Sequence, residues 1–160
     1  MSEDEKIILA IRVRGQVRVR PQIEDTLNKL LLGRLHQARL IKATPSMGGM
    51  ITKVKDYITW GVPSEEVIEQ LLIKRGRITG NVRLTDSYVK KNSSHSSVKT
   101  LAKAIAAGKA SVSDVEGLKP VFRLTPPTKG YRGKKNLGVG MGGINGDRGE
   151  GISELALRMI

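Results

Sequence analysis

The 160-residue sequence contains no cysteine, which excludes disulfide bonds, thiolate metal sites and cysteine nucleophiles. Aromatic residues make up only 3% of the chain, so a core must be built from Ile, Leu, Val and Ala. No apolar run approaches the ~18 residues that a membrane-spanning helix needs. The acidic residues 2–5 lack the basic and apolar regions of a signal peptide. We therefore expect a soluble, intracellular protein.

Acidic residues are also scarce, at 15 against 28 Lys and Arg, which leaves a formal net charge of +13. Small domains typically carry a net charge of about 2–8 in magnitude. The cations cluster in two acid-free segments, Lys6–Arg20 and Lys119–Lys135. This clustering favours a phosphate backbone over a membrane surface as the partner. Solubility alone is the alternative interpretation of the charge.

The first part of the chain predicts the order β-α-β-α-β, followed by one more helix. Alternation over Ile7–Val13 predicts a strand whose Ile and Val side chains face the core, while Arg12 and Arg14 face solvent. Pro21 and the acids that follow it predict a helix that ends near Gly33. The further expected elements are a strand at 38–43, a short helix at 46–55, a strand at 57–60 and a helix from Ser64 to Gly76.

The rest of the chain has weaker patterns. Gly80–Ser97 is polar and is expected to be irregular, and a helix follows it up to Gly108. Val121–Leu124 predicts a late strand. Gly130–Gly151 contains nine glycines in 22 residues, so we expect an extension that builds no core and is ordered only by a partner. The apolar residues of Ile152–Met159 predict a short helix that docks back.

Catalytic patterns are weak. Gly138–Gly143 matches G-x-G-x-x-G, but a lysine-rich coil rather than a strand precedes it, so we attribute the match to glycine richness. His36 and His95 lie far apart in sequence and predict no metal site. The serines lack a G-x-S-x-G elbow. We expect that the protein is not an enzyme and binds no cofactor. The alternative is an enzyme that holds a nucleotide on the glycine-rich loop.

Two segments carry the strongest binding pattern. Alternation directs the four arginines between Arg12 and Arg20 to one side of the chain, although a solvated sheet face would give the same pattern. Lys129–Lys135 combines cations, glycine and the ring of Tyr131, which could stack on a base. The alternative interpretation of this segment is a solvated tail that binds nothing. Both patterns predict contacts with a phosphate backbone.

Three motifs occur in an order that resembles a known family. Gly49–Val54 reads Gly-Met-Ile-Thr-Lys-Val and follows Thr44-Pro45, Tyr57–Pro63 reads Tyr-Ile-Thr-Trp-Gly-Val-Pro, and Phe122–Gly130 contains Phe-Arg-Leu-Thr-Pro-Pro. The chain thereby resembles the large-subunit ribosomal protein family numbered thirty, whose eukaryotic relatives are called protein seven. Its length is similar to that of archaeal members. Many members carry Arg where this chain has Gly48, so no RNA contact is implied there.

The resemblance implies an α+β fold with a ferredoxin-like β-α-β-α-β core and a three-stranded antiparallel sheet. Residues 1–61 would form this RNA-binding core, and 62–120 the helical insertion of archaeal and eukaryotic members. Residues 121–160 would form the late strand and a basic glycine-rich extension that packs back on the core.

The resemblance also implies a structural component of the large ribosomal subunit in the cytoplasm. Such a protein binds large-subunit ribosomal RNA by phosphate and shape contacts, near 5S RNA and neighbouring ribosomal proteins. A stand-alone RNA chaperone or assembly factor of the same fold is the alternative. The candidate RNA-binding residues are Arg12, Arg14, Arg18, Arg20, Arg34, Lys53, Lys55, Arg123, Lys129, Tyr131, Arg132, Lys134, Lys135 and Arg148.

Overall fold

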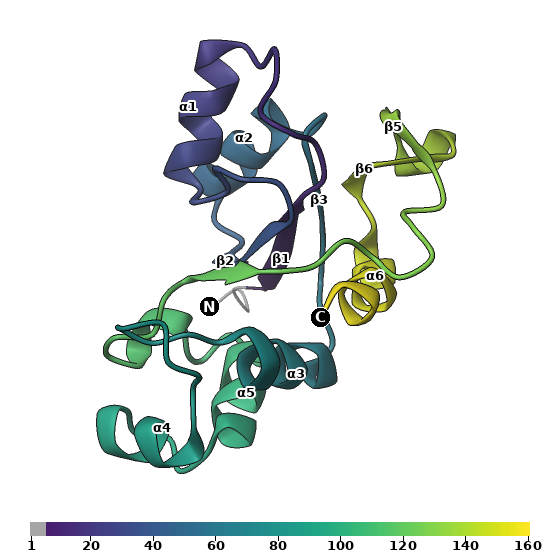
Figure 1. Cartoon of the computed structure of the whole chain (residues 1–160). Coiled ribbons are helices and arrows are strands. Elements are labelled where there is room, and N and C mark those ends of the chain that lie inside the picture. The colour runs from purple at the N-terminus through teal and green to yellow at the C-terminus, as the bar shows by residue number, and fades with distance from the viewer. Residues whose placement is uncertain (1–5) are drawn as a thin grey trace.

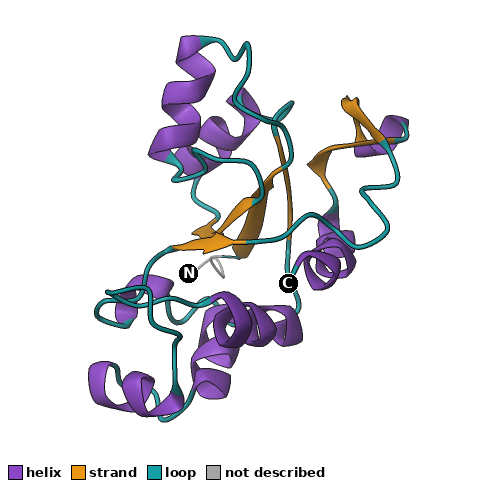
Figure 2. Cartoon of the chain, viewed as in Figure 1, coloured by secondary structure: helices purple, strands orange, loops and turns teal. Residues whose placement is uncertain are grey.

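A computed structural model describes residues 6–160 and shows one mixed β-sheet with helices on both of its faces (Figures 1 and 2). The acidic residues 2–5, on which the expectation of no signal peptide rests, lie outside the described residues. The strands are β1 (Ile7–Arg12), β2 (Gln37–Lys42), β3 (Ile58–Gly61), β4 (Val121–Arg123), β5 (Lys134–Gly138) and β6 (Gly143–Asp147). The helices are α1 (Pro21–Lys29), α2 (Pro45–Lys53), α3 (Glu65–Arg75), α4 (Asp86–Asn92), α5 (Val98–Ala106) and α6 (Ile152–Met159).

The strand order is β4-β2-β1-β3-β6-β5. Strand β1 is antiparallel to both of its neighbours, with Leu9 opposite Leu40 in β2 and opposite Gly61 in β3. Strand β4 adds to the outer edge of β2, and β6 joins β3 in parallel. The α+β class, the β-α-β-α-β order and the late strand are thus confirmed. The expected three-stranded sheet is not, because β4, β5 and β6 extend it to six strands.

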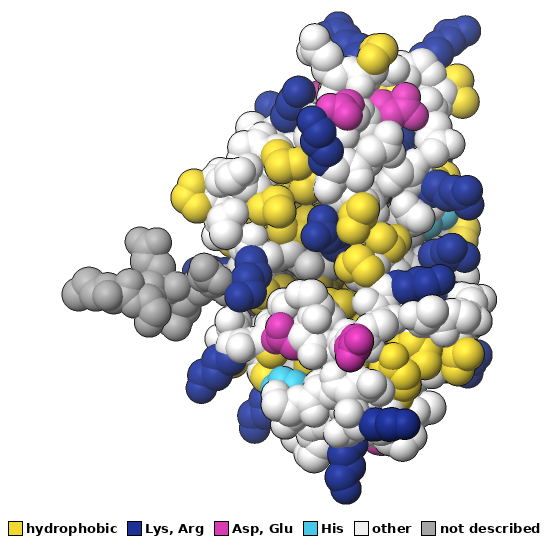
Figure 3. All heavy atoms as spheres, turned by 90° about the vertical axis from the view of Figure 1, so that its left-hand side faces the viewer, with side chains coloured by type: hydrophobic (Ala, Val, Ile, Leu, Met, Phe, Trp, Pro, Cys, Tyr) yellow, Lys and Arg dark blue, Asp and Glu magenta, His cyan; other side chains and the backbone are white. Residues whose placement is uncertain are grey.

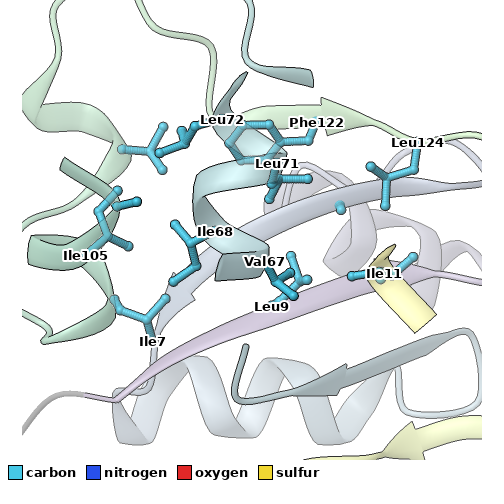
Figure 4. Close-up of a cluster of buried hydrophobic side chains, with 14 of the residues drawn as sticks. Ile7, Leu9, Ile11, Val67, Ile68, Leu71, Leu72, Ile105, Phe122 and Leu124 are labelled. Atoms are coloured by element: carbon cyan, nitrogen blue, oxygen red, sulfur yellow. The ribbon is translucent and has the colours of Figure 1, made fainter. Parts of the chain in front are cut away.

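The central strand β1 is covered on both faces. Its odd-numbered residues, such as Leu9, belong to a hydrophobic cluster with α3, α5 and α6 that includes Ile68 and Phe122 (Figure 4). Ala10 belongs to a second cluster with α1 and α2, which includes Leu27. In Figure 1 the two helix layers lie on opposite sides of the strands. Strand β1 therefore has no solvent-facing side.

Arg12 is the clearest departure from the sequence-based expectation. We expected its side chain to face solvent, yet its exposed fraction is 0% because α1 and α2 cover that face. Its guanidinium donates to three main-chain carbonyls: Nε to Arg14 (2.8 Å), Nη1 to Leu32 (2.9 Å) and Nη2 to Gly15 (3.2 Å). Burial lowers the pKa of Arg12, and the nearby carboxylate of Glu24 opposes that shift. The candidate role of Arg12 in RNA binding is therefore wrong: it fixes the loop after β1.

The glycine-rich extension also packs more closely than expected. Ile144 of β6 is completely buried in the same cluster as β1, so the expectation that this segment builds no core is wrong. A Cβ on Gly143 would collide with the carbonyl of Leu137 in β5, so the close approach of these strands requires glycine. The expected closing helix is present as α6, whose Ile152 and Met159 are buried. The dependence of this segment's order on a partner stays a prediction.

One helix lies where the sequence predicted irregular structure. Helix α4 begins after Thr85, whose side chain accepts a hydrogen bond from the backbone N–H of Tyr88. It is seven residues long and buries one residue of its own, Val89. So short a helix shows no repeating apolar stripe, and the expectation for Gly80–Ser97 is wrong for that reason.

We expect Gly61→Ala to lower the free energy of unfolding by about 1–3 kcal/mol, as overpacking does in well-packed regions. A Cβ there would meet the carbonyl of Gly149 and the side chain of Ile152, and would push the start of α6 away from β3. Gly48→Ala is the control, since nothing lies within 4 Å of its Cβ and the position is helical. That change should stabilise the protein by up to about 1 kcal/mol. Urea unfolding measures both, and equal effects of the two variants would contradict the packing described.

We expect Arg12→Gln to destabilise the protein by about 3 kcal/mol, because it leaves buried carbonyl oxygens without donors. Arg20→Gln removes the same charge from an exposed site and should change stability by less than about 0.5 kcal/mol. Thermal unfolding of both variants checks this difference. Equal stability of the two would show that Arg12 does not hold the loop after β1.

Candidate nucleic-acid interface

A hollow of about 350 Å³ lies beyond the end of β1. It is lined by Val13, Arg14, Gly15, Val17, Arg18, Leu35, Tyr57 and Lys135, and we call it the β1-exit hollow. Three of these residues are candidate RNA-binding residues from two distant segments: Arg14 and Arg18 follow β1, and Lys135 belongs to β5. No acidic residue lines the hollow. The fold thus brings the two acid-free segments of the sequence together.

Arg14 is held in place at this hollow. Its guanidinium carbon lies 4.8 Å from the centre of the Tyr57 ring, and its Nη1 donates to the main-chain oxygen of Asp56 at 3.4 Å. A guanidinium over an aromatic ring gains electrostatic attraction from the ring face. The side chain is half-buried, with donors left for an anion.

Three exposed candidates take an unusual backbone conformation. Arg18, Lys129 and Arg132 have φ angles of 57°, 64° and 55°, in the left-handed region that residues with a Cβ seldom occupy. Such strained positions persist only where surrounding structure holds them, and they are common at ligand sites. Leu31, His36 and Asn81, which are not candidates, share this conformation, so it does not by itself mark a binding site.

The side chain of Tyr131 is engaged in contacts within the protein. Its hydroxyl is 2.7 Å from Nδ1 of His36, and the two rings stack with centroids 6.0 Å apart. Burial raises the pKa of Tyr131 to about 12, and burial together with Lys135 lowers the pKa of His36. The pair ties the extension to the loop before β2, so in this structure the Tyr131 ring is not free to stack on a base.

Arg148 also serves the fold. Its backbone N–H donates to Trp60, its Nε to the hydroxyl of Thr59 (3.0 Å) and its Nη2 to the carbonyl of Ile144 (3.2 Å). Burial lowers its pKa. The bonds to Trp60 and Thr59 join the end of β6 to β3, so the half-buried guanidinium has a structural role.

The other candidates are exposed but spread over several surfaces. Arg34 lines an adjoining hollow with Gln16, and Arg123 lines a third hollow with residues that sequence reasoning missed. The rest line none of these hollows: Arg20, Lys53, Lys55, Lys129, Arg132 and Lys134. The residues of this hollow that were not among the candidates are Arg75, Arg77 and Lys119. Of these, a sequence pattern indicated only Lys119, which begins the second acid-free segment.

Few of the cations are neutralised within the described part of the chain. Its ion pairs join Lys29 to Asp25 (2.8 Å) and Glu154 to both Arg132 and Arg158 (4.0 Å each), all three at least partly exposed. Figure 3 shows Lys and Arg side chains following one another along its right-hand border at mid-height, with no acidic side chain between them. An excess of unpaired cations favours a polyanionic partner.

The geometry argues against the enzyme alternative. Gly138–Gly143 links β5 to β6 through a single 3-10 turn, and no α-helix opens there to receive a pyrophosphate. Residues 6–160 contain no group of three His, Asp or Glu arranged to hold a metal ion. None of the helices within that range is long and apolar enough to cross a membrane.

Comparisons with known proteins point to one family. Residues 8–58 match the family model described as ribosomal protein L30p/L7e. The chain is 47% identical over 154 residues to large ribosomal subunit protein uL30 of Methanobrevibacter smithii, covering 96% of this chain and 100% of the relative. It is 48% identical to that of Methanosphaera stadtmanae (94% and 97% covered) and 43% identical to that of Thermofilum pendens (96% and 99% covered). With similarity of this extent along nearly its whole length, the chain belongs to the L30p/L7e family of ribosomal proteins.

Proposed function

We propose that this chain is a structural component of the large ribosomal subunit and that it binds large-subunit ribosomal RNA by phosphate and shape contacts. Its relatives carry the name large ribosomal subunit protein, and the family is structural rather than enzymatic. Membership of that subunit gives the chain a cytoplasmic location. The convergence of Arg14, Arg18 and Lys135 on one acid-free hollow is the observation that carries RNA binding.

The β1-exit hollow suits a phosphate backbone. Arginine offers a planar set of donors that can grip two phosphate oxygens at once, whereas lysine offers a point charge. The apolar part of the lining, with Val13 and Leu35, excludes water from one side and strengthens these contacts. Release of counterions from the RNA supplies much of the free energy and makes binding sensitive to salt.

We expect the chain to make few contacts with individual bases. The ring of Tyr131 is engaged by His36, and Arg14 covers one face of Tyr57. With so few free rings, the chain recognises RNA by the path of its backbone and by shape. Exposed Lys129, Arg132 and Lys134 on the glycine-rich extension would follow that backbone further.

The resemblance to the ribosomal family also supports inferences about the neighbours and the domain organisation of the chain. We infer that 5S RNA and other large-subunit proteins lie close to the chain. Residues 62–120 would be the insertion of archaeal and eukaryotic members, between the core (1–61) and the late strand with its extension (121–160). Helices α3 and α5 of the insertion pack in the same hydrophobic cluster as β1, which supports a role in stabilising the core.

Neutralising the hollow should weaken RNA binding. We expect Arg14→Gln with Arg18→Gln to reduce affinity for deproteinised large-subunit ribosomal RNA and to flatten the salt dependence by about 0.7–0.9 log units per lost phosphate contact. Lys90→Gln with Lys91→Gln removes the same charge from the exposed end of α4 and should leave the slope unchanged. Filter binding between about 50 and 200 mM salt measures both. Equal slopes for the two double variants would remove the hollow from the interface.

Sedimentation separates a ribosomal component from an assembly factor. We expect the tagged chain to travel with mature large subunits on sucrose gradients, at one copy per subunit, because a structural protein stays in the finished particle. The small-subunit fraction of the same gradient is the control. Confinement of the chain to immature particles would favour the assembly-factor alternative.

A further inference from the structure

A second cationic hollow, of about 220 Å³, lies at the free edge of β4. It is lined by Arg75, Arg77, Asn81, Lys119, Val121 and Arg123, and we call it the β4-edge hollow. Four of its six lining residues are cations, and none is acidic. It shares no residue with the β1-exit hollow.

The backbone brings these cations together from separate segments. The N–H of Lys119 donates to the carbonyl of Arg77 at 2.8 Å, so the two residues lie side by side. Arg77 also pairs with Arg83 in an antiparallel bridge, and Asn81 takes a φ of 61° in the turn between them. The hollow is thus a product of tertiary folding, which explains why no local pattern in the sequence indicated it.

Hydrogen bonds to main-chain oxygens hold two of the guanidiniums. Arg75 donates through Nη2 to the main-chain oxygen of Ile160 (2.8 Å). Arg77 donates through Nη1 to the carbonyls of Lys74 (3.2 Å) and Gly76 (3.0 Å), which covers the negative end of α3. The Nε and Nη2 donors of Arg77 bond to no other described residue. A guanidinium that is fixed in this way binds an anion at a lower cost in conformational entropy.

Three of the four cations of the hollow have no carboxylate side chain as a partner among the described residues. Among described residues, no Asp or Glu lies within ion-pair distance of Arg77, Lys119 or Arg123. Like charges that converge without a counter-charge repel one another and lower stability. A bound anion would remove that repulsion, and this favours an anion site over a merely solvated surface.

We propose that the β4-edge hollow binds a phosphate of the RNA backbone, as a second contact apart from the β1-exit hollow. This proposal rests on the proposed function, because the RNA is the one that the β1-exit hollow binds. Val121 lines both the β4-edge hollow and the hollow that contains Gln16 and Arg34. Gln16 and Arg34 are in turn the sequence neighbours of Gly15 and Leu35, which line the β1-exit hollow. No acidic residue lines any of the three. A series of hollows that contain cations and no acidic residue fits a polymer of phosphates better than an isolated anion.

The test compares three double variants of the full chain on deproteinised large-subunit ribosomal RNA. We expect Arg77→Gln with Lys119→Gln to weaken binding about ten-fold or more and to lower the salt slope by about one unit per lost phosphate contact. Lys90→Gln with Lys91→Gln is the matched control, and Arg14→Gln with Arg18→Gln reports on the first hollow. Far-UV circular dichroism and melting temperature show that each variant is folded.

The outcomes separate the two proposals. Loss of affinity in the Arg14/Arg18 variant alone would overturn the β4-edge site and leave the proposed function standing. No loss in either variant would overturn both. Normal RNA affinity of the Arg77/Lys119 variant with reduced incorporation into subunits would assign the hollow to a protein partner and also overturn the proposal.

A second readout needs no ribosomal RNA. Tripolyphosphate titrated into the ¹⁵N-labelled chain should shift the backbone amides of Arg77, Lys119 and Arg123 in a saturable way. These shifts should vanish in the Arg77/Lys119 variant and persist in the Lys90/Lys91 variant. Absence of saturable shifts at these amides in the unmodified chain would contradict a phosphate site there.

Discussion

The coverage of β1 on both faces is the constraint from which the rest of the architecture follows. Helices α1 and α2 bury one side of this strand, and α3, α5 and α6 bury the other. Cations on or next to the central strands can then reach solvent only where those strands end or where the sheet has an edge. The β1-exit hollow lies at such an end, and the β4-edge hollow at such an edge. The coverage of β1 on both faces therefore produces both the aliphatic core and the cationic rim, by which we mean the β1-exit and β4-edge hollows at the border of the sheet.

Arg12 shows how the core and the rim are joined. It sits on the last position of β1, completely buried, and bonds to the carbonyls of Arg14 and Gly15 in the loop that lines the first hollow. A buried cation is costly unless its donors are satisfied, and here three carbonyls satisfy them. On the other side of the hollow, the Tyr131–His36 pair and the bonds of Arg148 place the glycine-rich extension against β3. Both walls of the β1-exit hollow are therefore fixed by interactions inside the protein.

The sequence predicted much of the fold, because local patterns determine most of its elements. The alternation of Ile7–Val13, the acids after Ser64 and the apolar stripe of α5 each gave the correct element. What it missed depends on contacts between distant segments. Nothing local shows that α1 and α2 cover Arg12, that Ile144 enters the core, or that the chain places Arg77 beside Lys119. The charge excess predicted the kind of partner, and only the fold shows which cations meet.

Chemical footprinting of lysines is the measurement that tests most directly whether the rim of the sheet faces RNA. Acetylation rates of individual lysines would be compared by mass spectrometry in the free chain and in the chain bound to large-subunit ribosomal RNA. We expect strong protection of Lys135 and Lys119, which line the two hollows, and unchanged rates for Lys90 and Lys91 at the end of α4. Protection of Lys90 and Lys91, with Lys119 and Lys135 as reactive as in the free chain, would contradict this expectation.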